Sequence, residues 1–183
     1  AKLIEKRGEP RIGEPSSVPL TDGELPSYWR FHPGSERIGE ACEFIVLALG
    51  KLGGREPNYH SDLDLVFLYD AEGMTHAPRR STIQNTSNNH FFSELSQRII
   101  KRATHFGPYG RLYDIDPRLR PTGRSGSLAM SLAGFVRYFH EGGGQLWERQ
   151  SLCKARVIVG SEAATARAME AVTEAIYCKP WQR

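Results

Sequence analysis

The fold is decided by residues 44–69, which read FIVLALGKLGGREPNYHSDLDLVFLY. The stretch opens with an unbroken apolar run, FIVLAL, whose length and flanks predict a strand buried on both faces. A glycine-rich segment, residues 50–54, follows this run. A second strand is predicted over residues 62–69. Polar and apolar residues alternate at its start, so Asp62 and Asp64 share one face of the strand.

Hydrophobic periodicity predicts mostly strands in the first part of the chain and helices in the last part. The clearest helix carries Phe91, Leu95 and Ile99 at four-residue intervals. The sequence therefore predicts an α+β fold in which a small mixed sheet is flanked by helices and further helices follow at the C-terminal end. Beyond the opening stretch, the expected elements are a helix over 88–104, strands over 111–116 and 127–130, and helices over 131–141, 145–157 and 161–177.

Composition along the chain indicates three segments. Residues 1–42 combine the end of a helix with a Pro- and Gly-rich loop, which Trp29 and Phe31 are expected to anchor. Residues 43–160 form the compact domain. Residues 161–183 form a C-terminal helix, which we interpret as the start of a truncated helical region.

Length and composition exclude several classes of protein. The chain has 183 residues, of which 39% are hydrophobic and 25% charged, as is typical of one globular domain rather than a disordered chain. No apolar run approaches the ~20 residues of a membrane span, and no signal peptide is recognisable. The three cysteines have no metal-ligand spacing and do not suggest a disulfide framework, which favours a cytoplasmic protein.

Asp62 and Asp64 are the first candidates for chemistry. Two carboxylates that project from one face of a strand repel each other, and divalent cations relieve this repulsion. Mg²⁺ prefers hard oxygen ligands, and two such ions can clamp the attacking and leaving oxygens of a phosphoryl displacement. Asp116 on the third expected strand is our choice for the third carboxylate, as a metal ligand and proton acceptor, with Asp114 as the alternative. A merely polar strand edge is disfavoured, because an apolar buried strand follows.

Other residues are candidates for binding nucleotide phosphates. A glycine pair lets backbone N–H groups approach phosphate oxygens, although a plain turn explains it equally well. Ser61 and Lys51 could each bind a phosphate, but a serine in a turn and a solvated surface lysine explain them equally well. Two arginines directly after the third expected strand suit bidentate phosphate contacts. The nucleotide-binding candidates are Gly53, Gly54, Ser61, Lys51, Arg118 and Arg120.

The charge distribution supports an anionic ligand near these arginines. Lys and Arg number 24 against 21 Asp and Glu, a net charge of +3 that predicts nothing by itself. Residues 98–124, however, hold seven Lys or Arg against two acids. No aromatic platform is interleaved with the basic residues, which argues against single-stranded nucleic acid as the ligand. On the helix expected over 145–157, Lys154 and Arg156 either reach the nucleotide or form ion pairs with an acid such as Glu148.

Three blocks of this sequence resemble the bacterial glutamine synthetase adenylyltransferase family. They occur in the family's order and lie within residues 43–160, roughly two-thirds of the chain. The resemblance implies a polymerase-β-like nucleotidyltransferase fold for these residues. The seven-residue gap between Gly54 and Asp62 is somewhat shorter than that superfamily usually shows. The blocks are LGKLGGRE with SDLDLVF within 49–67, LYDIDPRLRP at 112–121, and WER with KAR within 147–156.

The resemblance also implies an activity, with ATP as substrate and two Mg²⁺ ions as cofactor. Enzymes of the family carry two such domains: one transfers AMP from ATP to a tyrosine hydroxyl of glutamine synthetase, and the other removes it by phosphorolysis. The signalling protein PII and glutamine decide which reaction runs. This chain has one motif set, so we expect one half. Leu112-Tyr113 and Thr122-Gly123 favour the adenylylating half. The expected partners are glutamine synthetase, as protein substrate, and PII, which acts through the full-length enzyme. Neither nucleic acid nor a membrane is expected as a partner.

Four alternatives stay open at this stage. In the first, the chain is the deadenylylating half of the same enzyme. In the second, it is a nucleotidyltransferase that uses the same acids on a nucleic acid or small alcohol. A non-catalytic nucleotide-sensing module would bind ATP without transfer. A purely structural fragment would bind glutamine synthetase without metal.

Overall fold

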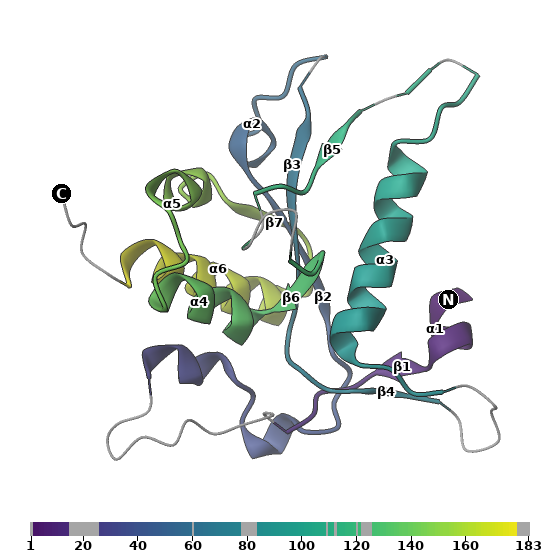
Figure 1. Cartoon of the computed structure of the whole chain (residues 1–183), viewed down its shortest axis with the longest axis vertical. Coiled ribbons are helices and arrows are strands. Elements are labelled where there is room, and N and C mark those ends of the chain that lie inside the picture. Colours follow the sequence, from purple (N-terminus) through teal and green to yellow (C-terminus); the bar gives the residue numbers. More distant parts are fainter. Residues whose placement is uncertain are drawn as a thin grey trace.

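The computed structural model describes residues 2–14, 26–59, 61–77, 84–108, 110–111, 113–119, 121 and 126–178. The fold is α+β, and its main sheet is small, open and flanked by helices (Figure 1). Its elements are α1 (Lys2–Arg7), β1 (Glu9–Pro10), the 3-10 turns η1 (Ser27–Phe31) and η2 (Ser35–Arg37), β2 (Phe44–Ala48), α2 (Gly50–Gly53), β3 (Leu63–Tyr69), β4 (Thr75–His76), α3 (Asn88–Ala103), β5 (Ile115–Asp116), β6 (Ala129–Ser131), α4 (Leu132–His140), α5 (Leu146–Leu152), β7 (Arg156–Val159) and α6 (Glu162–Tyr177).

The main sheet is mixed and is organised around β3. Its strand order is β5-β3-β2-β7, and β6 also pairs with β3, beyond the end of β5. β2 pairs antiparallel with both β3 and β7, whereas β5 and β6 run parallel to β3. β1 and β4 form a separate antiparallel ribbon. The two strands predicted from the opening apolar runs are therefore the central pair of the sheet.

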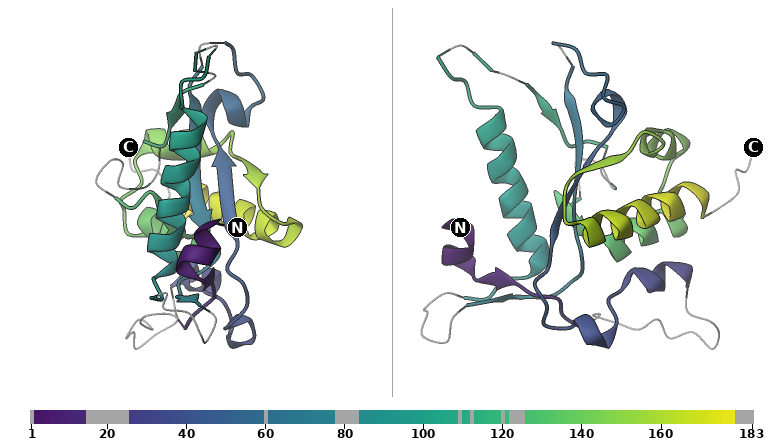
Figure 2. Two further views of the ribbon diagram at one scale, coloured as in Figure 1. Left: turned by 90° about the vertical axis from the view of Figure 1, so that its right-hand side faces the viewer. Right: turned by 180° about the vertical axis from the view of Figure 1, so that it is seen from behind.

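Alternation along the central strands divides the core into two layers. Ile45 and Leu47 of β2 belong to a cluster that α4, α5 and α6 cover. Val46 and Ala48 belong to a second cluster, which α3 and α1 cover. Because successive side chains of a strand point to opposite faces, one apolar run serves both layers. Figures 1 and 2 show α4 and α6 on one side of the sheet and α3 on the other.

The expected helix over residues 145–157 is wrong in its second half. α5 ends at Leu152, and residues 156–159 form the edge strand β7. In the antiparallel register, Arg156 lies opposite Ala48 and Val157 opposite Leu47. Residues 157–159 are Val, Ile and Val, and the β-branched side chains favour a strand where β2 offers an unpaired edge.

The strand expected over residues 111–116 is shorter than predicted. Of the described residues in this segment, Ile115 and Asp116 are the ones that pair with β3, where they lie opposite Leu63 and Asp64. One further backbone bond precedes them: the Leu63 N–H donates to the Asp114 carbonyl oxygen at 2.8 Å. Leu112 lies outside the described residues. The helix expected over 88–104 is confirmed as α3, and Ser87 caps it by accepting a hydrogen bond from the His90 N–H.

The segment before β2 contains short regular elements. Tyr28 and Phe31 pack against the α4–α6 side of the core, and Trp29 lies against His32 with ring centroids 4.2 Å apart. Within the described ranges, every helix is too short or too polar to cross a lipid bilayer.

Candidate active site

Three carboxylates gather where β3 begins. Asp64 is the second residue of β3 and lies opposite Asp116 of β5 in parallel register. Asp62 directly precedes the strand and is exposed to solvent. Burial raises the pKa of the Asp64 carboxyl above its usual value, and the negative charges of Asp116 and Asp62 raise it further. The charges of Arg118 and Lys51 act in the opposite direction. The three acids are therefore close enough to interact electrostatically.

Asp116 is held by the arginine that follows it. The Arg118 Nε donates to both carboxylate oxygens at 2.8 Å, its Nη2 donates to Oδ2, and its backbone N–H donates to Oδ1 at 2.9 Å. The Asp116 side chain is only 15% exposed, whereas that of Arg118 is 57% exposed. The guanidinium is thus within reach of both the acid cluster and solvent.

Asp114 has a different environment. Its carboxylate pairs with Arg111, and its side chain is 43% exposed. It is absent from the principal charges that shift the Asp64 pKa, whereas Asp116 and Asp62 are among them. Of the two candidates for the third acid, Asp116 is thus the one in register with Asp64.

Gly50 brings α2 against the acid cluster. The sequence analysis did not single out this glycine, which begins α2 with a positive φ of 52°. A Cβ at this position would overlap the Oδ2 atom of Asp64. Only glycine adopts this backbone without strain and leaves room for the carboxylate. The sequence offered one hint of this role, a glycine directly after a predicted buried strand. The contact itself joins residues fourteen positions apart, so no local pattern predicts it.

Gly53 and Gly54 lie at the end of α2 rather than in an open turn. Their N–H groups donate to the carbonyl oxygens of Leu49 and Gly50 at 2.8 and 3.1 Å. A Cβ on Gly53 would overlap the carbonyl oxygen of Lys154, whereas a Cβ on Gly54 would make ordinary contacts. The requirement for glycine at residue 53 therefore comes from close packing of two backbones.

The remaining nucleotide candidates occupy separate positions. Ser61 is buried in a turn, where its hydroxyl donates to Asn58 Oδ1 at 2.7 Å and accepts from the Asn58 N–H at 3.1 Å. Lys51 is exposed on α2, close enough to act on Asp64. Arg120 lies outside the described residues, as do Thr122 and Gly123.

The basic residues after α5 contact the α2 segment. Lys154 pairs with Glu56 at 3.1 Å, and both side chains are more than half exposed. Arg156 donates from Nε to the Gly53 carbonyl at 3.2 Å and from Nη2 to the Leu52 carbonyl at 2.9 Å. Glu148 is not their partner: it is buried and accepts hydrogen bonds from Tyr138 and from the Gln145 N–H.

The acid cluster supplies the donors that Mg²⁺ prefers, although Arg118 holds one of them. Asp62 and Asp64 make no hydrogen bond or ion pair through their carboxylates with any residue that the structure describes. Across the same residues, no group of three or more His, Cys, Asp or Glu side chains is arranged to hold a metal ion. Arg118 covers both oxygens of Asp116. The carboxylate donors thus suit a divalent cation in their chemistry, whereas their arrangement among the described residues does not form a metal site.

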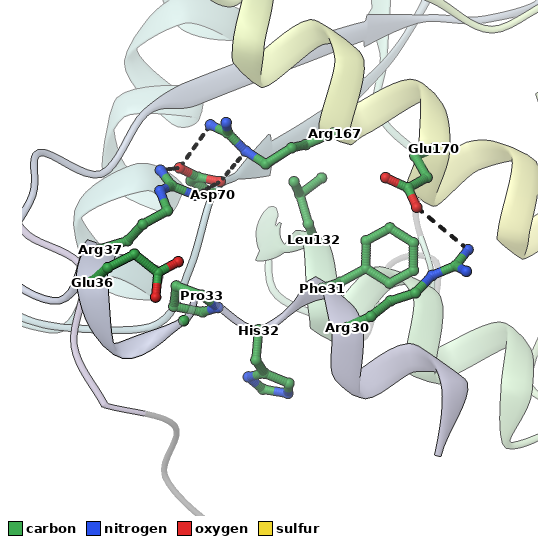
Figure 3. Close-up of a pocket in the computed structure, with 11 residues that line it drawn as sticks. Arg30, Phe31, His32, Pro33, Glu36, Arg37, Asp70, Leu132, Arg167 and Glu170 are labelled. Atoms are coloured by element: carbon green, nitrogen blue, oxygen red, sulfur yellow. Dashed lines mark hydrogen bonds and ion pairs between the residues drawn. The ribbon is translucent and has the colours of Figure 1, made fainter. Parts of the chain in front are cut away.

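A separate cavity of about 210 Å³ lies at the other end of β3. Its wall contains Asp70, which directly follows the strand and is 3% exposed. Arg167 of α6 binds both oxygens of Asp70 at 2.9 and 3.0 Å, and Arg37 of η2 binds them from the opposite side (Figure 3). The sequence analysis did not identify this cluster.

Comparison with known proteins identifies the family. The model of the glutamate-ammonia ligase adenylyltransferase family matches residues 25–171 of this chain. The chain belongs to this family. The match confirms the resemblance drawn from the three sequence blocks, and it covers the acid cluster, α2 and β7.

The chain is also similar to part of a longer curated protein. That protein is the bifunctional glutamine synthetase adenylyltransferase/adenylyl-removing enzyme of Vibrio parahaemolyticus serotype O3:K6 (strain RIMD 2210633). The two sequences are 45% identical over 120 residues, which is 66% of this chain and 12% of the relative. The chain thus matches a small part of that protein.

Proposed function

We propose that this domain transfers AMP from ATP to a tyrosine hydroxyl of glutamine synthetase. The single observation that carries the proposal is the register of β3 and β5, which sets Asp64 opposite Asp116 with Asp62 beside them. Family membership supports the reaction class, and the name of the Vibrio relative supports glutamine synthetase as the protein substrate.

In the proposed reaction, Asp62, Asp64 and Asp116 would hold two Mg²⁺ ions that accompany ATP. Bound there, these ions would supply charge neutralisation at the phosphates and at the attacking oxygen. Arg118, whose side chain is 57% exposed, would turn toward the triphosphate when ATP binds. Lys51 adds positive charge on the α2 side.

The bond changes are those of a nucleotidyl transfer. The tyrosine oxygen forms a bond to the α-phosphorus of ATP, the bond from that phosphorus to the bridging oxygen of pyrophosphate breaks, and pyrophosphate leaves with the electron pair. The Asp116 carboxylate accepts the phenolic proton. Arg118 stabilises the negative charge that develops on the phosphate oxygens.

The adenylylating direction rests on Leu112-Tyr113 and Thr122-Gly123 of the sequence. The printed name of the Vibrio relative also includes adenylyl removal, which supports phosphorolysis of adenylylated glutamine synthetase as the second candidate. PII is proposed to act on this domain through a longer protein, and the whole enzyme is proposed to work in the cytoplasm.

The test is an AMP-transfer assay with ATP labelled at the α-phosphate, Mg²⁺ and glutamine synthetase. The wild-type chain is expected to label glutamine synthetase and release pyrophosphate. The double variant Asp62→Asn, Asp64→Asn is expected to lose about 10³-fold in rate, since several kcal/mol of charge stabilisation disappear. Near-normal transfer by this variant would contradict the proposal.

Two further experiments distinguish Asp114 from Asp116 as the third acid, and AMP transfer from AMP removal. Asp114→Asn is the matched control on the same segment, and we expect it to retain transfer within about threefold, because a nearby surface charge has a small effect. If Asp114→Asn is inactive and Asp116→Asn is active, the third acid is Asp114. Release of ADP from adenylylated glutamine synthetase and phosphate, without forward transfer, would assign the removing activity instead.

A further inference from the structure

Arg156 joins the edge strand β7 to the segment that approaches the acid cluster. Its Nε donates to the Gly53 carbonyl at 3.2 Å and its Nη2 to the Leu52 carbonyl at 2.9 Å. These two carbonyls belong to the last residues of α2. The Leu52 carbonyl also accepts the Arg55 N–H at 3.2 Å, so Arg156 adds a second bond there and binds the neighbouring Gly53 carbonyl as well. One half-buried guanidinium therefore closes the C-terminal end of α2 from a residue about a hundred positions away.

Backbone packing fixes the same end of α2. Gly53 lies so close to the backbone of Lys154 and Ala48 that a Cβ would overlap a carbonyl oxygen of each. Arg156 lies opposite Ala48 in the β2–β7 ladder, where the chain leaves β2 for α2. The α2 segment is thus held between two strands by one packed glycine and one arginine.

The other end of α2 meets the catalytic carboxylate. Gly50, its first residue, leaves no space for a Cβ beside Asp64 Oδ2, and Lys51 follows it on α2. α2 has only the four residues Gly50–Gly53 and so links the contacts of Arg156 at one end to the Asp64 contact at the other.

From these contacts we infer that Arg156 is a positioning residue for the nucleotide site: it holds α2 so that Gly50 and Lys51 lie against Asp64 where the ATP phosphates bind. The inference rests on the proposed function, because it assigns the positioned site to MgATP. Arg156 itself does not contact the substrate in this account. Its two bonds are made to main-chain carbonyls.

The test compares Arg156→Met, Arg156→Lys and Lys154→Met by calorimetric titration with MgATP and by amide hydrogen exchange. Arg156→Met keeps an unbranched aliphatic stem and removes both hydrogen bonds. We expect MgATP binding to weaken about tenfold, the size of one charge-assisted hydrogen bond. The amides of residues 53–56 should exchange faster, whereas those of β3 and α6 should not change.

Two variants serve as controls. Arg156→Lys keeps the charge but reaches one carbonyl at a time, so we expect an intermediate loss of about threefold. Lys154→Met removes the exposed ion pair with Glu56 beside the same segment and should change MgATP affinity less than twofold. In the transfer assay, Arg156→Met should raise the KM for ATP while the KM for glutamine synthetase stays unchanged.

The outcomes separate this inference from the proposed function. If the wild-type chain binds MgATP and Arg156→Met binds it equally well, with unchanged exchange at residues 53–56, the positioning role is overturned and the proposed function stands. If the wild-type chain does not bind MgATP, both are overturned. If amide exchange rises uniformly over the whole Arg156→Met chain, and the KM for ATP and the KM for glutamine synthetase increase equally, the variant is generally destabilised. This outcome would also contradict the positioning role.

Discussion

The two ends of β3 each carry carboxylates, but their surroundings are opposite. Asp70, at the C-terminal end, is buried and has both oxygens bound by Arg37 and Arg167 (Figure 3). The carboxylate of Asp64, at the N-terminal end, makes no hydrogen bond or ion pair within the described part of the chain, and its neighbours include two further acids. Removing a buried carboxylate that is fully paired is destabilising, because the charges of its partners are left uncompensated. A partly buried one that faces like charges indicates a site for cations.

The largest effect is expected for activity at the N-terminal end. The single variant Asp64→Asn should reduce AMP transfer about 10³-fold, because the amide cannot replace the anionic ligand at the phosphates. Its free energy of unfolding should stay equal to or above that of the wild type. Transfer kinetics and urea unfolding on the same preparation provide both values. If Asp64→Asn loses both transfer and folding stability, the claim that this end of β3 serves activity rather than stability is contradicted.

The next effect is expected for stability at the C-terminal end. Asp70→Asn leaves two partly exposed guanidinium groups around a neutral amide, which should lower the free energy of unfolding by about 2–3 kcal/mol. The side chains of Arg37 and Arg167 are 23% and 30% exposed, so water recovers part of the loss. Urea denaturation measures the change. The matched control Glu40→Gln removes only an exposed partner of Arg37 and should change stability by less than about 0.5 kcal/mol.

The two glycines of the pair should differ. Gly53→Ala forces a Cβ into the carbonyl oxygens of Lys154 and Ala48, and we expect a loss of about 2 kcal/mol in the free energy of unfolding. Gly54→Ala meets only ordinary contacts at a helical φ of −74° and should change stability by about 0.5 kcal/mol or less, in either direction. Equal effects at the two positions would contradict the packing role of Gly53.

The smallest effect is expected in the pH dependence of stability. Because the folded-state pKa of the Asp64 carboxyl lies above its unfolded value, ionised Asp64 opposes folding. Its penalty is absent below the ordinary pKa of 3.8 and develops as pH rises through the raised folded pKa. Asp64→Asn should therefore be more stable than wild type at pH 7 by less than about 1 kcal/mol, and equally stable near pH 3. Urea unfolding at several pH values measures the difference, and the opposite sign would contradict the account.

Sequence patterns predicted what local periodicity controls. The apolar runs that became β2 and β3 and the periodic stripe of α3 could be predicted, because burial follows from spacing within each segment. β7 was missed because its four residues become a strand only by pairing with the distant edge of β2.

The candidate site shows the same division. The proximity of Asp62 and Asp64 was predictable, because the two residues are only two positions apart in the sequence. Their role in a site stays a prediction. The roles of Gly50 and Arg156 were not predictable, because they depend on contacts to Asp64 and to the end of α2 that only the folded chain creates.

The most direct test of the difference between the two ends of β3 is a titration with Mn²⁺ and ATP, followed by electron paramagnetic resonance of the free ion. The account predicts that the wild-type chain and Asp70→Asn, measured at a temperature where that variant is folded, bind Mn²⁺ with ATP equally well. The variant Asp62→Asn, Asp64→Asn should bind it at least tenfold more weakly, as expected when anionic ligands are removed. Equal Mn²⁺ binding by the double variant and the wild type would contradict the account.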